Sequence, residues 1–207
     1  MAQPVSGAVG EIPLQDGACA VFRQGRLAEQ IVSLCHAELY ETTSRSHAFL
    51  ASVSLGTLTT AAVSCTGLII INPTGNTKNA AIGKVYVSNS VTSSATEIWL
   101  AQFVQAKLPS TMTTATAVTM TCGKLGSATA TVGAYSSCNA LDNAPALLWP
   151  LLHNTVAIAT TGEDQGALLD LQGGLIVPPG YGIAIVAPAA ATGAGINAGI
   201  WWEEVAV

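Results

Sequence analysis

The stretch GLIVPPGYGIAIVA, residues 174–187, decides the fold class of this chain. Its two apolar runs, 174–177 and 181–187, are rich in isoleucine and valine and have the length of β-strands. Between them, Pro179 and Gly180 stand at the central positions of a type II turn. Proline presets the φ of the first central position, and glycine tolerates the positive φ of the second. The stretch therefore predicts a strand, a tight turn and another strand.

The sequence that follows, GIWWEEV at residues 199–205, predicts a terminal strand. Successive side chains of a strand point to opposite faces. Trp201 and Glu203 are therefore expected on one face, and Trp202 and Glu204 on the other. The two glutamates cannot both face one substrate.

Several more strands are predicted upstream. Residues 66–72 (TGLIIIN) are a buried-strand run that ends in an Asn-Pro-Thr-Gly turn. Residues 81–89 alternate and, after a loop at 90–95, are expected to pair with a strand at 97–104. The alternation places these residues on one face of the first member of the pair: Ile82, Lys84, Tyr86 and Ser88.

The remaining strand signals are shorter. Residues 53–64 mix β-branched and small residues, and two apolar runs cover 147–153 and 154–159, with Pro150 placing its strand at an edge or a bend. The Ser/Thr-rich residues 109–140 specify register weakly, so long surface connections are expected there. Eight to ten short strands predict an all-β, jelly-roll-like β-sandwich over residues 46–207.

Residues 1–45 differ from the rest, because they hold eight of the nineteen charged residues. They are predicted to form an N-terminal arm or hairpin segment. Residues 26–39 are compatible with a helix, but the stripe of Leu27, Ile31 and Leu34 is followed in its row by a charged Glu38. An extended strand over 30–41 fits equally well and is favoured, because glycines punctuate the preceding segment.

Charge is scarce in this chain of 207 residues. Half of the residues are apolar and 9% are charged, against roughly 25% in an ordinary soluble domain. Such a chain is expected to hide much of its surface against other subunits, the alternative being a monomer coated with Thr, Ser and Asn. A net charge of −5 and seven scattered cations argue against nucleic-acid or anionic-membrane partners.

Cysteines and hydropathy give further expectations. Five cysteines (Cys19, Cys35, Cys65, Cys122 and Cys138) form no CxxC pair. They are interpreted as buried thiols of a protein assembled in a reducing cytoplasm, with a Cys122–Cys138 disulfide as the alternative. The start carries no secretory signal pattern, so export is not expected. Residues 171–202 hold no charge, but Pro and Gly break them into strand-length pieces, so no membrane helix is predicted.

The stretches GLIIINPTGNTKNAAIGKVYV (67–87) and GGLIVPPGYGIAI (173–185), with the ending AGIWWEEVAV (198–207), resemble small virion proteins of tailed bacteriophages. The Trp-Glu-Glu-Val close after a Pro-Gly turn is the most specific element. The resemblance covers about residues 10–207 in pattern. It implies a jelly-roll head decoration, cement or minor capsid protein, often a trimer. The five cysteines and the Ser/Thr-rich region depart from that group.

Motifs for chemistry are missing from the sequence. The three histidines, His36, His47 and His153, show no metal-ligand spacing, and no nucleotide-binding or nucleophile-elbow motif occurs. Glu163 and Asp164 with Asp170 could hold calcium, but a solvated acidic loop is the favoured interpretation. The sequence therefore predicts no enzyme, no cofactor, no metal site and no small-molecule substrate.

The expected function is structural, in a virion assembled in the bacterial cytoplasm, with the chain itself and a major capsid protein as partners. Paired tryptophans on a terminal strand are interpreted as a core anchor plus an interface anchor. Stacking of Trp201 or Trp202 on sugars, in a receptor- or carbohydrate-binding module of a phage tail or fibre, is the alternative. The predicted interface residues are Ile31, Leu34, Tyr40, Trp201, Trp202 and Val205.

Overall fold

The computed structural model describes residues 40–56, 58–59, 62–89, 96–104, 115–138, 141–154, 166–187 and 196–207. The chain divides into two compact units, Met1–Glu41 and Thr42–Val207, and the β-structure belongs to the second. Most of the predicted arm, including Ile31 and Leu34, lies outside the described residues. The short helix α1 (Tyr40–Ser44) includes the last two residues of the extended strand expected over 30–41, and residues 30–39 lie outside the described residues.

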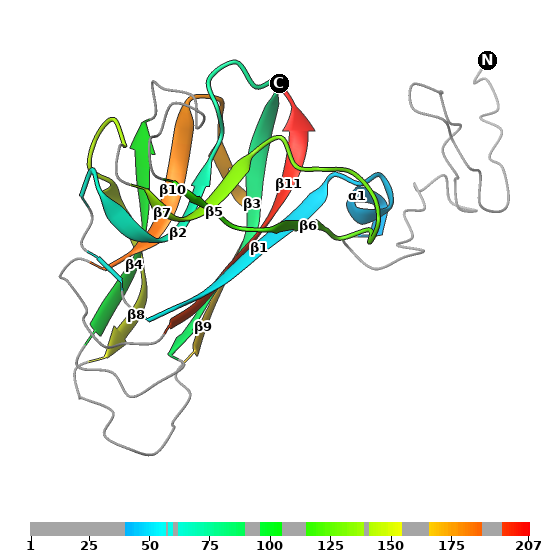
Figure 1. The fold of residues 1–207 in the computed structure, drawn as a ribbon. Coiled ribbons are helices and arrows are strands. Elements are labelled where there is room, and N and C mark those ends of the chain that lie inside the picture. The colour runs from blue at the N-terminus through cyan, green and yellow to red at the C-terminus, as the bar shows by residue number, and fades with distance from the viewer. Residues whose placement is uncertain are drawn as a thin grey trace, which may run out of the picture. The chain divides into compact units, whose positions relative to one another are not determined.

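The described residues form two antiparallel sheets, which Figure 1 shows as two layers. The first sheet has the order β6-β1-β11-β3-β9 and the second the order β5-β7-β2-β10-β4-β8. The strands of the first sheet are β1 (Ala48–Leu55), β3 (Lys78–Asn89), β6 (Met120–Cys122), β9 (Gly166–Val177) and β11 (Ile196–Ala206). Those of the second sheet are β2 (Cys65–Ile71), β4 (Thr96–Val104), β5 (Thr116–Ala117), β7 (Gly133–Cys138), β8 (Ala146–Asn154) and β10 (Tyr181–Val186).

The strand order is nested. When β5, β6 and β7 are set aside, the first remaining strand pairs with the last (β1 with β11), and the second with the second to last (β2 with β10). The third pairs with the third to last (β3 with β9), and the middle two pair with each other (β4 with β8). The eight strands thus have the connectivity of one long hairpin that is folded over into two layers. The strands β5, β6 and β7 are inserted between β4 and β8, at the closed end of this hairpin.

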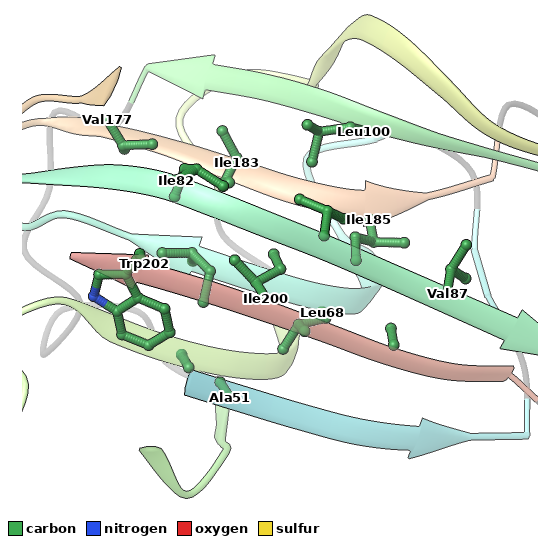
Figure 2. Close-up of a cluster of buried hydrophobic side chains, with 14 of the residues drawn as sticks. Ala51, Leu68, Ile82, Val87, Leu100, Val177, Ile183, Ile185, Ile200 and Trp202 are labelled. Atoms are coloured by element: carbon green, nitrogen blue, oxygen red, sulfur yellow. The ribbon is translucent and has the colours of Figure 1, made fainter. Parts of the chain in front are cut away.

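The core lies between the two sheets. Figure 2 shows Ile183, Ile185 and Leu100 of the second sheet together with Ile82 and Trp202 of the first, and all of them belong to one buried cluster. Burying this apolar area is the main force that holds the sheets together. The predicted all-β sandwich is confirmed.

A second, smaller core covers the outer face of the second sheet. Ile69 and Ile71 of β2, Phe103 of β4 and Ala184 of β10 are buried there, although they point away from the main core. Leu141 packs against them, and its backbone N–H bonds to the carbonyl oxygen of Val63. The smaller core therefore covers the outer face of the second sheet over β2, β4, β7 and β10.

The expected pairing of residues 81–89 with 97–104 is wrong. Both segments are strands, β3 and β4, but they lie in opposite sheets. Val85 and Val87 of β3 and Ile98 and Leu100 of β4 all point into the main core. Apolar side chains of the two strands therefore meet in the core between the sheets instead of lying side by side in one sheet.

The expected alternation within β3 is also wrong. Ile82 is buried with Val85 and Val87, while Lys84 and Tyr86 are exposed. Against β11, Trp202 pairs with Ile82 and Trp201 pairs with Lys84, so the residue of β3 between them has no opposite residue. A β-bulge adds one residue, which moves every later side chain to the other face. The inserted residue is Gly83.

The turn at residues 178–181 is confirmed. Gly180 has a φ of 84°, and the N–H of Tyr181 donates to the carbonyl of Pro178. The turn joins β9 to β10 and thus connects the two sheets. The fully buried Asn72 holds this turn in place. Its side-chain amide donates to the backbone carbonyl of Val177, and its backbone carbonyl accepts the N–H of Gly180.

Other predictions hold in part. Pro150 lies in β8, the edge strand of the second sheet, as expected. The strand expected at 53–64 is displaced, because β1 ends at Leu55. Residues 109–140 are not only surface connections, because they contain the strands β5, β6 and β7. Residues 154–159 lie outside the described residues, apart from Asn154.

Candidate interaction surface

The outer face of the first sheet carries large apolar side chains in register. Leu50 of β1 lies opposite Trp201 of β11, and Tyr86 of β3 lies opposite Leu168 of β9. Ile176 and Val205 lie on the same face. We call these six residues the Trp201 face: Leu50, Tyr86, Leu168, Ile176, Trp201 and Val205. All are exposed except Trp201, which is half-buried.

The bulge at Gly83 makes room for Trp201. A Cβ atom at Gly83 would lie 1.9 Å from the Cε3 and Cζ3 atoms of the Trp201 ring. The indole therefore covers the bare backbone of β3. Because β11 is the central strand of this sheet, the ring lies in the middle of the face. The bulge thus both sets the register of β3 and positions the largest side chain of the surface.

Little charge interrupts this face. Lys84 Nζ lies 3.7 Å from Asp170 Oδ2, and both side chains are exposed. An exposed pair of this kind contributes little stability. Its two charges cancel, so Glu203, which alternates with Trp201 along β11, supplies the remaining charge of the face. A partner that meets this surface would have to be largely uncharged.

A second apolar surface lies on β8. Leu147, Leu148 and Trp149 are exposed, with Trp149 at 52%. Pro150 follows them and has no backbone N–H to donate to an added strand. An edge strand with a proline resists continuation of the sheet. The exposed side chains of β8 are therefore available for contacts, while its backbone is a poor template for strand addition.

A buried charged group among the described residues serves the fold. Glu204 is 1% exposed, and its carboxylate accepts the N–H groups of Thr131 at 2.7 Å and of Val132 at 3.0 Å. It also accepts the Thr131 hydroxyl at 2.8 Å and the Lys78 ammonium at 3.2 Å. Each oxygen has two donors, so the carboxylate holds the segment before β7 against β11.

The polar groups nearby complete a network. The side-chain amide of Asn76 donates to Asn72 Oδ1 at 2.7 Å and to Thr131 Oγ1 at 3.1 Å. Within the part of the chain that the structure describes, no group of three or more His, Cys, Asp or Glu side chains is arranged to hold a metal ion. The network joins turns to strands.

The predicted interface residues are distributed as follows. Trp201 and Val205 lie together on the Trp201 face, and Tyr40 is exposed at the start of α1. Trp202 is 0% exposed and stacks on Phe49 in the core, with ring centroids 6.1 Å apart. Its assignment as an interface residue is corrected, because its side chain offers no surface to a partner. Its indole N–H has no hydrogen-bond partner.

Sequence reasoning missed Leu50, Tyr86, Leu168 and Ile176. Alternation in β9 contained a usable signal, because Leu168 is followed at every second position by Asp170 and Gln172. An apolar residue in an otherwise polar row indicates an exposed contact residue. Of the calcium candidates, Glu163 and Asp164 lie outside the described residues, and Asp170 pairs with Lys84.

Comparison with protein-family models, with curated proteins and with solved structures finds no match to this chain. Among the described residues, no helix has the length and apolar character needed to cross a membrane.

Proposed function

We propose that this chain is a structural, non-enzymatic virion protein that stabilises a bacteriophage capsid through contacts between subunits. In this role it is a head decoration, cement or minor capsid protein, whose partners are copies of itself, arranged as a trimer, and a major capsid protein. The observation that carries the proposal is the Trp201 face, an uncovered sheet surface with six apolar side chains and one neutralised ion pair.

The fold supports the same role. The nested strand order favours a jelly roll, the double-sheet architecture of two Greek keys that occurs in viral capsid and lectin domains. Fold alone does not define function. The stretches 173–185 and 198–207 resemble small phage virion proteins, and this resemblance favours a capsid role over a lectin role.

The energetics suit a purely mechanical task. Burial of apolar surface contributes about 25 cal/mol per Å², and specific interfaces bury about 800 Å² on each partner. Large side chains in the middle of an interface usually supply most of the binding free energy. Trp201, Tyr86 and Leu168 are side chains of this type on adjacent strands.

The first experiment measures self-association. Tyr86→Lys and Leu168→Lys each place a charge on the Trp201 face at an exposed position, with 45% and 65% exposure, so folding should survive. Light scattering coupled to size exclusion is expected to show an oligomer for the unmodified chain. Each variant should weaken association at least tenfold, which corresponds to about 1.4 kcal/mol.

The matched control is Leu125→Lys. Leu125 is 82% exposed and lies in the turn that follows β6. The same substitution there should leave the oligomer intact. A chain that runs as a monomer at micromolar concentration, or a loss of association in the control alone, would contradict the proposal.

The second experiment tests the virion. Phage particles from cells that carry the gene are banded on a density gradient and examined by mass spectrometry and electron microscopy. The chain is expected in the particle band in fixed proportion to the major capsid protein. Its absence from intact particles would refute the capsid role even if the chain is oligomeric.

A receptor- or carbohydrate-binding module of a tail or fibre is the second candidate, and the observation that favours it is the exposed indole of Trp149. Exposed aromatic rings can stack on sugar rings, whereas Trp202 is buried and cannot. Host polysaccharide should then change tryptophan fluorescence, and Trp149→Ala should abolish the change. Unchanged fluorescence and a blank glycan array would exclude this candidate.

A further inference from the structure

Two cysteines lie opposite each other in the second sheet. Cys65 of β2 pairs in register with Cys138 of β7. Both are 2% exposed and both belong to the small core on the outer face of that sheet. Neither is in a disulfide. The function proposed above does not use this pair.

The register brings the two sulfurs within reach of each other. Opposed residues of antiparallel strands point to the same face, with Cβ atoms about 4.5–5.5 Å apart. A disulfide requires a Cβ separation of about 3.5–4.5 Å, so a small approach of the strands is sufficient. The pairing of β2 with β7 is irregular between Thr66 and Ile69, directly beside Cys65. An irregular ladder can adjust more easily than a continuous one.

A further observation supports their proximity. Burial, and to a smaller extent the neighbouring Cys138, raises the pKa of the Cys65 thiol to about 12. Burial and, to a smaller extent, Cys138 also raise the pKa of Tyr135, which lies in β7 with Cys138. Cys138 thus acts electrostatically on groups of both strands.

The structure also excludes the disulfide considered from the sequence. Cys122 lies in β6 of the first sheet and packs in the main core, while Cys138 lies in the smaller core beyond the second sheet. The second sheet separates the two thiols. The partner of Cys138 is Cys65.

We propose that Cys65 and Cys138 are a disulfide site: oxidation by a low-molecular-weight disulfide such as oxidised glutathione forms a Cys65–Cys138 bond that links β2 covalently to β7. This proposal goes beyond the capsid role and does not depend on it. The bond would fix the inserted β5–β7 segment to the sandwich when the protein passes from a reducing to an oxidising compartment.

The reaction is two successive thiol–disulfide exchanges. One cysteine loses its proton, and its thiolate attacks a sulfur of oxidised glutathione. A mixed disulfide forms and one glutathione leaves. The second cysteine, also as thiolate, attacks the protein sulfur of the mixed disulfide and releases the second glutathione. The two electrons and two protons lost by the cysteines end on two molecules of reduced glutathione.

The test is oxidation of the folded chain by oxidised glutathione at mildly alkaline pH. The remaining thiols are then alkylated, and the disulfides are mapped by mass spectrometry without reduction. We expect a linked peptide pair that contains Cys65 and Cys138, with the loss of two hydrogens. Because the bond closes a long loop, the thermal midpoint should rise by roughly 5–10 °C, and a reductant should reverse the rise.

Two variants make the test specific. Cys138→Ala should remove the linked pair and the thermal shift, whereas Cys122→Ala should retain both. If Cys138→Ala does not fold, the peptide map of the unmodified chain decides alone. Unlinked Cys65 after full exposure to the oxidant, or a link from Cys65 only to another cysteine, would overturn the proposal. The Leu168→Lys variant should still form the bond, which separates this test from that of the capsid role.

Discussion

At Gly83 the absence of a side chain allows the Trp201 indole to lie against the sheet. Gly83→Ala would place a methyl group 1.9 Å from two ring carbons, so the ring must move away from the face. Overpacking of this kind costs about 1–3 kcal/mol. The variant should therefore lower the urea midpoint of unfolding and weaken self-association together.

Gly56→Ala is the control for this prediction. Gly56 is exposed just after β1, and nothing lies within 4 Å of a Cβ atom built there. Its urea midpoint should differ little from that of the unmodified chain. If Gly83→Ala were equally stable and equally oligomeric, Trp201 would not be held by the bulge.

Because of Cys65, the free energy of unfolding is expected to fall as the pH rises in the alkaline range. Burial raises the pKa of its thiol from 9.0 to about 12, so the folded chain keeps the proton where the unfolded chain loses it. Stability from this group is complete below pH 9.0 and falls as the pH rises toward about 12. Each pH unit in that window removes about 1.4 kcal/mol.

Urea unfolding measured at several pH values checks this dependence. Cys65→Ala should flatten the slope between pH 9.0 and about 12, although its stability near neutral pH is somewhat lower. An unchanged slope in the variant would assign the alkaline loss to other groups. Tyr135, whose pKa is raised by burial, is the next group to replace in that case.

At the scale of the elements, Glu204 joins β11 to the segment before β7. Glu204→Gln removes the charge that faces Lys78 and turns an acceptor oxygen into a donor amide beside the N–H of Thr131 or Val132. Hydrogen bonds to a buried charge contribute about 1.5–3 kcal/mol each, and an unsatisfied donor adds its own cost. The variant should lose about 2–4 kcal/mol of unfolding free energy.

Glu203→Gln provides the comparison within the same strand. Glu203 is half-buried on the other face of β11, away from this network. The change in its unfolding free energy should stay within about 0.5 kcal/mol. Equal losses in the two variants would mean that the buried network does not hold the segment before β7.

The sequence predicts strands better than it predicts their partners. The run at 66–72, which forms β2 (Cys65–Ile71), and the turn at 178–181 are local patterns, and both occur as expected. The bulge at Gly83 reverses the faces of β3, and nothing in the alternation of its residues predicts it. Whether β3 pairs with β4 depends on apolar area buried across the sandwich, which is a property of two sheets and not of either segment.

The composition of the Trp201 face is predictable from the sequence to a similar extent. Alternation in the terminal strand separates Trp201 from Trp202, and the structure places them on opposite faces. The sequence does not say which face is the core. That choice follows from the position of β11 between β1 and β3, since only one side of this sheet meets the second sheet.

At the scale of the whole molecule, the small number of charged residues and the exposed apolar Trp201 face both favour association through apolar contacts. A chain with 9% charged residues and a net charge of −5 has few ionic contacts to offer. On the Trp201 face the pair Lys84–Asp170 is already neutralised. Association through this face should therefore be driven by apolar burial, and its response to salt should differ from that of an electrostatic interface.

Sedimentation at increasing salt distinguishes the two cases. From about 0.1 M to about 1 M sodium chloride the Debye length falls from ~10 Å to ~3 Å, which would weaken contacts between charges. We expect the dissociation constant of the oligomer to stay constant or to fall, and sodium sulfate to strengthen association further because it is excluded from apolar surface. Tyr86→Lys should remain the weaker oligomer at every salt concentration, since its loss is apolar area as well as added charge. An affinity that drops steeply with sodium chloride would instead place the contact on charged residues outside the Trp201 face.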